Sequence, residues 1–217
     1  MKKYTFKLLT LALVTSALIS CKKNAEEAAT KEAEVATEAK TTSEKYTVDV
    51  AASSIEWLGT KPTGTHNGTI NIENGVFTTN NSAIESGTFL IDMKSIVNLD
   101  IESPEYNEKL VNHLKSADFF EVEKYPDAAF EVTGFEEKDN KTMLSGNLKL
   151  KEKKNNVTFP VMVTTEGDNI TITSETFTID RAKWDVKHQS KSFFSDLGDK
   201  FINDDIELKI TVKAKKS

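Results

Sequence analysis

The sequence predicts an all-β domain, an eight-stranded antiparallel barrel with one short helix, and three observations support this. From residue 46 onward, apolar residues recur at every second position in short runs, which is the period of a half-buried strand. Asn, Asp and Gly residues that favour turns separate these runs. One stretch changes to helical spacing, and strands do not alternate with long helices. This pattern favours a barrel or a sandwich over a parallel α/β sheet.

The chain begins with the features of a secretory signal. Lysines in the first seven residues precede an uncharged apolar stretch, residues 8–19, which is shorter than the roughly 20 residues needed to span a bilayer. It ends in Leu18-Ile19-Ser20-Cys21, which resembles a bacterial lipobox, and Cys21 is the only cysteine. We predict that residues 1–20 are a lipoprotein signal peptide and that Cys21 is lipidated. The alternative is a buried free thiol.

A lipidated Cys21 would tether the protein to a membrane of the bacterial cell envelope, on the periplasmic or outer-membrane side. Residues 22–45 are mostly Ala, Glu, Lys and Thr, with no aromatic residue and with Val35 as the only large aliphatic one. Such a segment cannot bury an apolar face, so we expect residues 21–45 to be the lipidated cysteine and a flexible, solvated tether. A partner-binding helix is the alternative for this segment.

The folded domain is expected to span residues 46–217, which is long enough to bury a substantial core. No disulfide can stabilise it, because no second cysteine exists. The chain carries 28 basic and 34 acidic residues, for a net charge of −6. An acidic domain without a basic stripe argues against nucleic acid as a partner.

Eight or nine strands are expected in chain order. The clearest is the last, in which Ile206, Leu208 and Ile210 alternate with charged residues. The expected strands cover residues 46–50, 55–58, 69–77, 89–93, 130–135, 144–150, 157–163, 170–179 and 206–214.

The single helix is expected to begin at Ser103-Pro104-Glu105. Ser103 suits the N-cap, Pro is favoured at the first helical position, and an early acid suits the positive end of the helix dipole. Leu110, Val111 and Leu114 follow at helical spacing. A closed barrel of eight strands is wide enough to be filled by side chains or to hold one small ligand.

A series of short motifs runs from residue 46 to about 215. They are Tyr46-Thr47-Val48-Asp49, Ser54-Ile55-Glu56-Trp57, His66-Asn67-Gly68, residues 112–120 at the helix end, Tyr125-Pro126, Gly146-Asn147-Leu148-Lys149-Leu150, Val157-Thr158-Phe159-Pro160-Val161, Phe177-Thr178-Ile179-Asp180-Arg181 with Trp184, and Asp204-Asp205-Ile206-Glu207-Leu208. The order of these motifs resembles the YceI-like family of periplasmic, lipocalin-like, polyisoprenoid-binding proteins. The central hairpin departs from the family, since many members have Gly-Val-Thr where this chain has Glu152-Lys153-Lys154-Asn155-Asn156-Val157-Thr158. The anchor and the linker are additions.

The resemblance implies a lipocalin-like barrel with a long apolar cavity that holds an isoprenoid quinone or a polyprenol. Inward-facing apolar residues would line it. For each of them the alternative is ordinary core packing, because alternation shows which side chains face inward but not whether the interior is full. The candidates are Phe89, Ile91, Met93, Phe130, Leu148, Phe159, Phe177 and Ile179.

Polar residues near the same motifs are candidates for contact with a ligand head group. His66 lies in a loop that enters a strand, and Arg181 lies where a strand ends. Trp57 and Trp184 accompany these motifs in the sequence. A loop role for His66 and a structural ion pair for Arg181 are the alternatives. Phe193-Phe194 is interpreted as a loop tip that forms a lid, contacts a membrane or packs beneath the loop.

We predict a binding protein and not an enzyme, with no cofactor and no metal. His66, His113 and His188 lack the spacing of metal ligands, and no nucleophile or phosphate-binding motif occurs. The predicted function is storage or transport of an isoprenoid-type lipid. The first alternative is an interaction module whose packed barrel binds a protein or a glycan. The second is an enzyme in which His66 and His188 converge. A homodimer through an edge strand is also possible.

Overall fold

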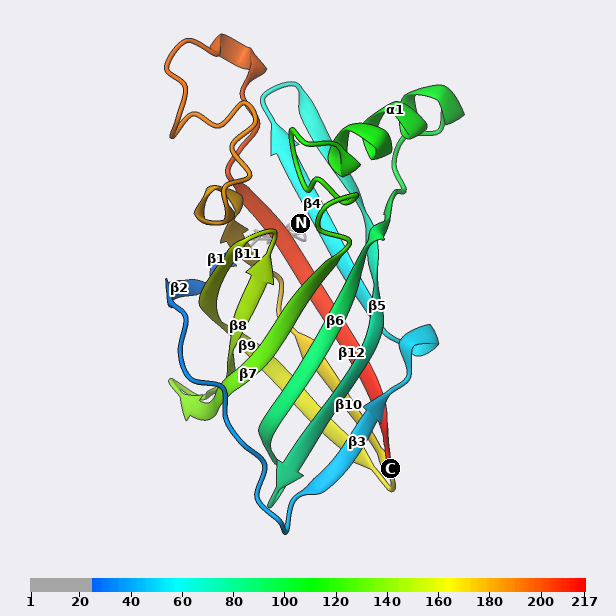
Figure 1. The fold of residues 1–217 in the computed structure, drawn as a ribbon, viewed down its shortest axis with the longest axis vertical. Coiled ribbons are helices and arrows are strands. Elements are labelled where there is room, and N and C mark those ends of the chain that lie inside the picture. The colour runs from blue at the N-terminus through cyan, green and yellow to red at the C-terminus, as the bar shows by residue number, and fades with distance from the viewer. Residues whose placement is uncertain (1–24) are drawn as a thin grey trace, which may run out of the picture.

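The computed structural model describes residues 25–217, so the predicted signal peptide and the predicted lipidation site Cys21 lie outside the described residues. Long antiparallel strands surround a central axis, and one helix lies at one end (Figure 1). The elements are β1 (Glu26–Glu27), β2 (Ala29–Glu32), β3 (Glu44–Val48), η1 (Val50–Ala52), β4 (Ser54–Lys61), β5 (Gly64–Asn80), β6 (Ala83–Asn98), α1 (Pro104–Lys115), β7 (Asp127–Lys138), β8 (Lys141–Leu150), β9 (Lys153–Glu166), β10 (Asn169–Ser174), β11 (Phe177–Asp180), η2 (Arg181–Trp184), η3 (Gly198–Lys200) and β12 (Asp205–Lys216).

The strand pairings form a closed circle, which confirms the expected eight-stranded antiparallel barrel. Going round the circle, β4 is followed by β5, β6, β7, β8, β9, β10 and β12, and β12 pairs back with β4. β3 continues the position of β4 toward the other end, where it also pairs with β5 and β12. Closure pairs these strands on both sides over most of the circle, with one break between β9 and β11.

The helix begins where the sequence predicted. Pro104 is its first residue and Ser103 occupies the N-cap position in an extended conformation. After Lys115 the chain turns back, and the backbone N–H of Phe120 donates to the carbonyl of Leu114 at 3.1 Å. Phe119 and Phe120 are thereby buried in the core. Figure 1 shows α1 at the same end of the barrel as the loop that contains η3.

The alternation of side chains is also as predicted, since the inward candidates all face the interior. Ile91 and Leu148 are half-buried and pack against the core cluster. The fully buried members are Phe89, Met93, Phe130, Phe159, Phe177 and Ile179.

One of the strands expected from the sequence is divided into two strands in the structure. Residues 170–179 form β10 and β11, because the chain leaves its pairing with β9 after Ser174. There the Ser174 hydroxyl accepts a hydrogen bond from the backbone N–H of Ile210 at 2.8 Å, and Glu175 N–H donates to the carbonyl of Pro160 at 3.1 Å. Beyond this break β11 pairs with β12 but not with β9, so both β9 and β11 have a free edge.

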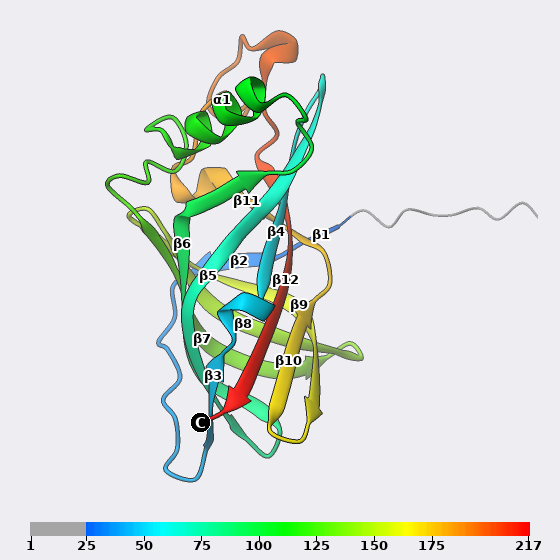
Figure 2. The same cartoon turned by 90° about the vertical axis from the view of Figure 1, so that its right-hand side faces the viewer.

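The described part of the expected tether, residues 25–45, differs from the prediction because it lies along the barrel wall (Figure 2). β1 pairs with the free edge of β11 and β2 with that of β9. Between them Ala28 is only 4% exposed and belongs to the core cluster. The composition indicated that this segment cannot bury a large apolar face. Its backbone can nevertheless satisfy the unpaired groups of two strand edges.

Candidate functional site

The barrel encloses two neighbouring cavities. The upper cavity, at the α1 end, has a volume of about 500 Å³. The lower cavity, deeper in the barrel, has about 100 Å³. Both are lined mostly by apolar side chains. We call the residues that line both cavities the waist, and these are Ile55, Ile91, Leu148, Ile179 and Leu208.

The mouth of the upper cavity is built from three separate segments. The β4–β5 hairpin contributes Lys61, α1 contributes Leu110, and the loop that carries η3 contributes Lys200. Below the mouth the wall consists of aliphatic and aromatic residues such as Ile96 and Met93. The upper cavity therefore has a polar rim and an apolar interior, which suits an amphiphilic ligand.

Aromatic rings fill most of the lower half. Phe159 and Phe177 stack with their ring centroids 4.3 Å apart and an interplanar angle of 4°. Phe130 joins this pair at 5.8 Å from Phe159, and Phe89 follows at 6.3 Å from Phe130. The row then continues through Phe77 to Tyr46.

Gly146 allows this row to pack tightly. A Cβ atom at this position would lie 2.2 to 2.6 Å from atoms of the Phe130 ring, which is closer than van der Waals contact permits. The bare glycine backbone on β8 therefore forms part of the surface against which Phe130 packs.

The sequence-predicted ligand residues divide between the two cavities. Trp57, His66, Met93 and Arg181 line the upper cavity. Phe89, Phe130, Phe159 and Phe177 line the lower cavity, and Ile91, Leu148 and Ile179 belong to the waist. Trp184 lines neither cavity; it is fully buried, and its Nε1–H donates to the carbonyl of Leu148 at 2.9 Å.

Arg181 has the surroundings of a structural residue. Its guanidinium is 1% exposed, donates to the carbonyls of Val186, His188, Ile202 and Asn203, and lies 3.3 Å from Asp204. Burial lowers the pKa of Arg181, and the nearby carboxylates of Asp204 and Asp180 oppose this effect. With its donors engaged, Arg181 fixes the loop after β11 and has little capacity left for a head group.

His66 lies at the rim and is paired with an acid. Its Nδ1 is 2.9 Å from Oδ2 of Asp100, whose other oxygen accepts the backbone N–H of Asn67 at 2.8 Å. Burial alone would raise the pKa of Asp100, but the hydrogen bonds from Asn67, His66 and Asn98 bring it below its ordinary value.

Trp57 offers a free donor in the upper cavity. Its side chain is buried and lines that cavity, yet its indole Nε1–H has no hydrogen-bond partner among residues 25–217. A buried donor without a partner is costly, so an acceptor atom on a bound ligand would satisfy it.

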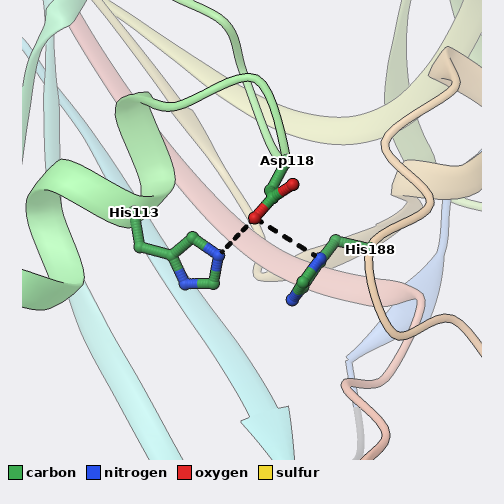
Figure 3. A group of neighbouring side chains, drawn as sticks. All are labelled: His113, Asp118 and His188. Carbon is green, nitrogen blue, oxygen red and sulfur yellow. Dashed lines mark hydrogen bonds and ion pairs between the residues drawn. The ribbon is translucent and has the colours of Figure 1, made fainter.

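Two histidines that the sequence left apart come together at the same mouth. His113, on the last turn of α1, and His188, in the loop after η2, both line the upper cavity, and their ring centroids are 4.9 Å apart. The Asp118 carboxylate lies against both imidazoles (Figure 3). Burial lowers the pKa of His188, and the positive charge of Arg181 adds to that effect while Asp118 opposes it.

The comparison with known families decides the assignment of the chain. The model of the YceI-like domain matches residues 46–214. The chain belongs to the YceI-like family. No curated protein sequence matches it.

Solved structures share the YceI-like fold. BcnA of Burkholderia cenocepacia is 22% identical, with a TM-score of 0.56 over 76% of this chain and 98% of that one. A polyisoprenoid binding domain from Saccharophagus degradans, implicated in plant cell wall breakdown, is 14% identical, with a TM-score of 0.57 over 79% of this chain and 98% of that one. At these identities the likeness concerns the fold alone.

The cluster of His113, Asp118 and His188 is the feature of this YceI-like domain that sequence reasoning missed. His113 and Asp118 stand close together in the chain, within residues 112–120, which contribute to the family resemblance without indicating a metal site. His188 is far away in the sequence, so no spacing rule could connect it with them. His66 and His188, whose convergence an enzyme would require, line the same cavity but belong to separate aspartate pairs.

Proposed function

We propose that the upper cavity binds the apolar chain of an isoprenoid lipid, a quinone or a polyprenol, and that the protein stores or transports this lipid in the cell envelope. The observation that supports the proposal is an apolar cavity of about 500 Å³ that lies inside a closed barrel and has a polar rim. This volume falls within the roughly 300–1,000 Å³ of typical ligand sites. A related fold is described as a polyisoprenoid binding domain.

The shape of the interior suits a long hydrocarbon tail. A polyisoprenoid makes no hydrogen bonds along its chain, and each buried CH₂ group contributes about 0.8 kcal/mol to binding. The upper cavity leads to the waist, and the lower cavity continues the same axis beyond it. A tail that enters at the α1 end would therefore run toward the row of phenylalanines.

The head group would lie near the mouth, where the polar side chains are. The indole N–H of Trp57 can donate to a carbonyl or hydroxyl oxygen of the ligand. His66 is held at the rim by Asp100 and can contact the same end of the ligand.

We further propose that a lipid on Cys21 holds the barrel close to its membrane. The five chain steps from Cys21 to Glu26 span at most about 17 Å. Because β1 pairs with β11 of the barrel, the barrel would lie closer to the membrane than a free tether of residues 21–45 would allow. Among residues 25–217, no helix is long and apolar enough to cross a membrane. Phe193 and Phe194, each 50% exposed in the loop before η3, would contact the bilayer surface.

Mass spectrometry of organic extracts would test the binding proposal. The full chain would be purified from its native envelope, beside an Ile91→Trp variant that blocks the waist and reports lipid carried over from the membrane. We expect about one isoprenoid lipid per protein, enriched over the variant. Equal extracts from the two proteins, together with an unchanged melting temperature when quinone is added, would reject lipid binding and favour the interaction module.

A further inference from the structure

Three side chains at the mouth of the upper cavity have the chemistry of metal ligands. His113 Nε2 lies 3.1 Å and His188 Nδ1 lies 3.8 Å from Oδ2 of Asp118, and one ligand atom from each residue lies within 4.8 Å of the others. Figure 3 shows both imidazoles directed toward the same carboxylate. The three side chains are 41%, 25% and 58% exposed for His113, His188 and Asp118, so an ion can reach them from solvent.

These separations are close to those of a tetrahedral site. Zinc bonds to imidazole nitrogen and carboxylate oxygen of about 2.0–2.1 Å place neighbouring ligand atoms roughly 3.3–3.5 Å apart. The distances of 3.1 and 3.8 Å lie on either side of this range. The two imidazole nitrogens lie within 4.8 Å of each other, so binding of an ion would draw the more exposed His113 ring toward His188.

The surrounding structure holds the three groups in place. Asp118 follows a tight turn in which its N–H donates to the Ser116 hydroxyl at 3.3 Å. The ring of Phe119 packs against both imidazoles, with centroids 5.0 Å from His113 and 5.2 Å from His188. The carbonyl of His188 accepts a hydrogen bond from Arg181 at 2.9 Å. These contacts restrict the positions of the Asp118 carboxylate and of both imidazole rings.

The charges near the cluster are compatible with a cation. Asp118 contributes one negative charge, and the neutral imidazole is the form that binds metal. The nearest buried cation, Arg181, is paired with Asp204 at 3.3 Å. Two imidazoles and one carboxylate suit a borderline divalent ion such as zinc, whereas calcium and magnesium prefer oxygen ligands alone.

We propose that His113, Asp118 and His188 bind one zinc ion at the mouth of the cavity. The inference is independent of lipid binding. Because His113 and Asp118 belong to the α1 segment and His188 to the loop after η2, the ion would connect two of the segments that form the mouth. Three protein ligands leave a fourth position for water or for an oxygen atom of a molecule in the cavity.

Titration of the full chain with Zn²⁺ and with Co²⁺ would test the proposal. The protein would carry Cys21→Ser, because a free thiol can bind zinc and Cys21 is the only cysteine. We expect one ion per chain by calorimetry, a Co²⁺ absorption spectrum typical of tetrahedral coordination, and a higher melting temperature with zinc. His113→Gln and His188→Gln should each weaken zinc binding by roughly 100-fold or more, since loss of an outer partner alone costs 10- to 100-fold.

The second histidine–aspartate pair of the same cavity provides the control. His66 and Asp100 lie 2.9 Å apart but belong to no three-ligand group among residues 25–217, so His66→Gln should leave zinc affinity unchanged. Circular dichroism of every variant would confirm that it is folded. The proposal is overturned if the parent protein does not bind one zinc ion per chain. It is equally overturned if the double variant His113→Gln/His188→Gln, or the milder Asp118→Asn, binds zinc as tightly as the parent.

Discussion

The upper and lower halves of the barrel share the same strands and the same alternation but differ in what fills them. In the lower half, four phenylalanines contact one another in a row and leave about 100 Å³. In the upper half, residues such as Ile70, Met93 and Ile96 line a space of about 500 Å³. An eight-stranded barrel can be filled or hollow, and here the size of the inward side chains decides which. The lower half provides stability, and we assign ligand binding to the upper half.

The largest expected effect is the loss of a ring from the lower half. Phe159→Ala removes the ring that stacks on Phe177 at 4.3 Å, and it should lower the free energy of unfolding by about 3–5 kcal/mol. Urea denaturation would measure this. Met162→Ala, at a 63% exposed position of the same strand, is the control and should change stability by less than about 0.5 kcal/mol. A loss below about 1 kcal/mol at Phe159 would mean that the lower half is not the packed core.

A methyl group at Gly146 tests how tightly the same row is packed. Because a Cβ there would overlap the Phe130 ring, Gly146→Ala should destabilise the protein by about 1–3 kcal/mol. Combining it with Phe130→Leu should recover part of that loss. Gly134→Ala on the neighbouring strand is the control, since its Cβ would lie 3.6 Å from Ser145 in ordinary contact. Equal melting temperatures for the two alanine variants would argue against tight packing here.

Blocking the waist tests whether the tail of a ligand in the upper cavity passes toward the lower half. Ile91→Trp places a large ring between the cavities, and we expect it to weaken binding of a long-chain quinone by at least about tenfold, or 1.4 kcal/mol. Binding measured by tryptophan fluorescence with quinones of increasing chain length would show the effect, which should be smallest for short tails. Val97→Trp, at an exposed position of the same strand, is the control. Equal affinities for both variants would show that the tail does not pass the waist.

The smallest expected effect concerns pH, and it separates the two ends of the docked N-terminal segment. Hydrogen bonds from the Ser43 hydroxyl and from the Lys40 backbone and side chain lower the pKa of Glu85 to about 2. A lowered carboxyl pKa stabilises the folded state above the ordinary value of 4.5, and this contribution is lost as the pH falls toward 2. The protection factors of amides around residues 40–43, which correct for the intrinsic exchange rate, should therefore fall between pH 4.5 and 2.

Backbone pairing at the other end of the segment does not titrate. Residues 26–32, which pair with β9 and β11, should stay protected over the same pH range, and Glu85→Gln should make residues 40–43 exchange quickly at every pH. Lys216 also lowers the pKa of the nearby Glu44 carboxyl. The Glu85→Gln variant separates the contribution of Glu85 from that of Glu44. Protection factors around residues 40–43 that do not change with pH in the parent would show that Glu85 does not hold this segment.

The family resemblance and the sequence pattern together predicted most of the barrel. Alternation is a local property of a strand, so the sequence predicted the inward positions of Phe89 and Phe159. Local capping residues likewise predicted the helix start at Ser103-Pro104. The break after Ser174 was not visible, because Thr and Ile continue the pattern up to it and a serine hydroxyl replaces one ladder bond there. The docking of residues 26–32 was missed for the same reason, since it depends on edges that this break leaves free.

The sequence by itself therefore determined the direction of each side chain and the kind of domain, because both follow from the period of the chain and from local turn and cap chemistry. Only the tertiary structure decided how much space remains inside, since that depends on which rings from different strands meet. It also decided which polar groups share the mouth. The ring centroids of His113 and His188 lie 4.9 Å apart only because the barrel brings α1 and the loop after η2 to the same end.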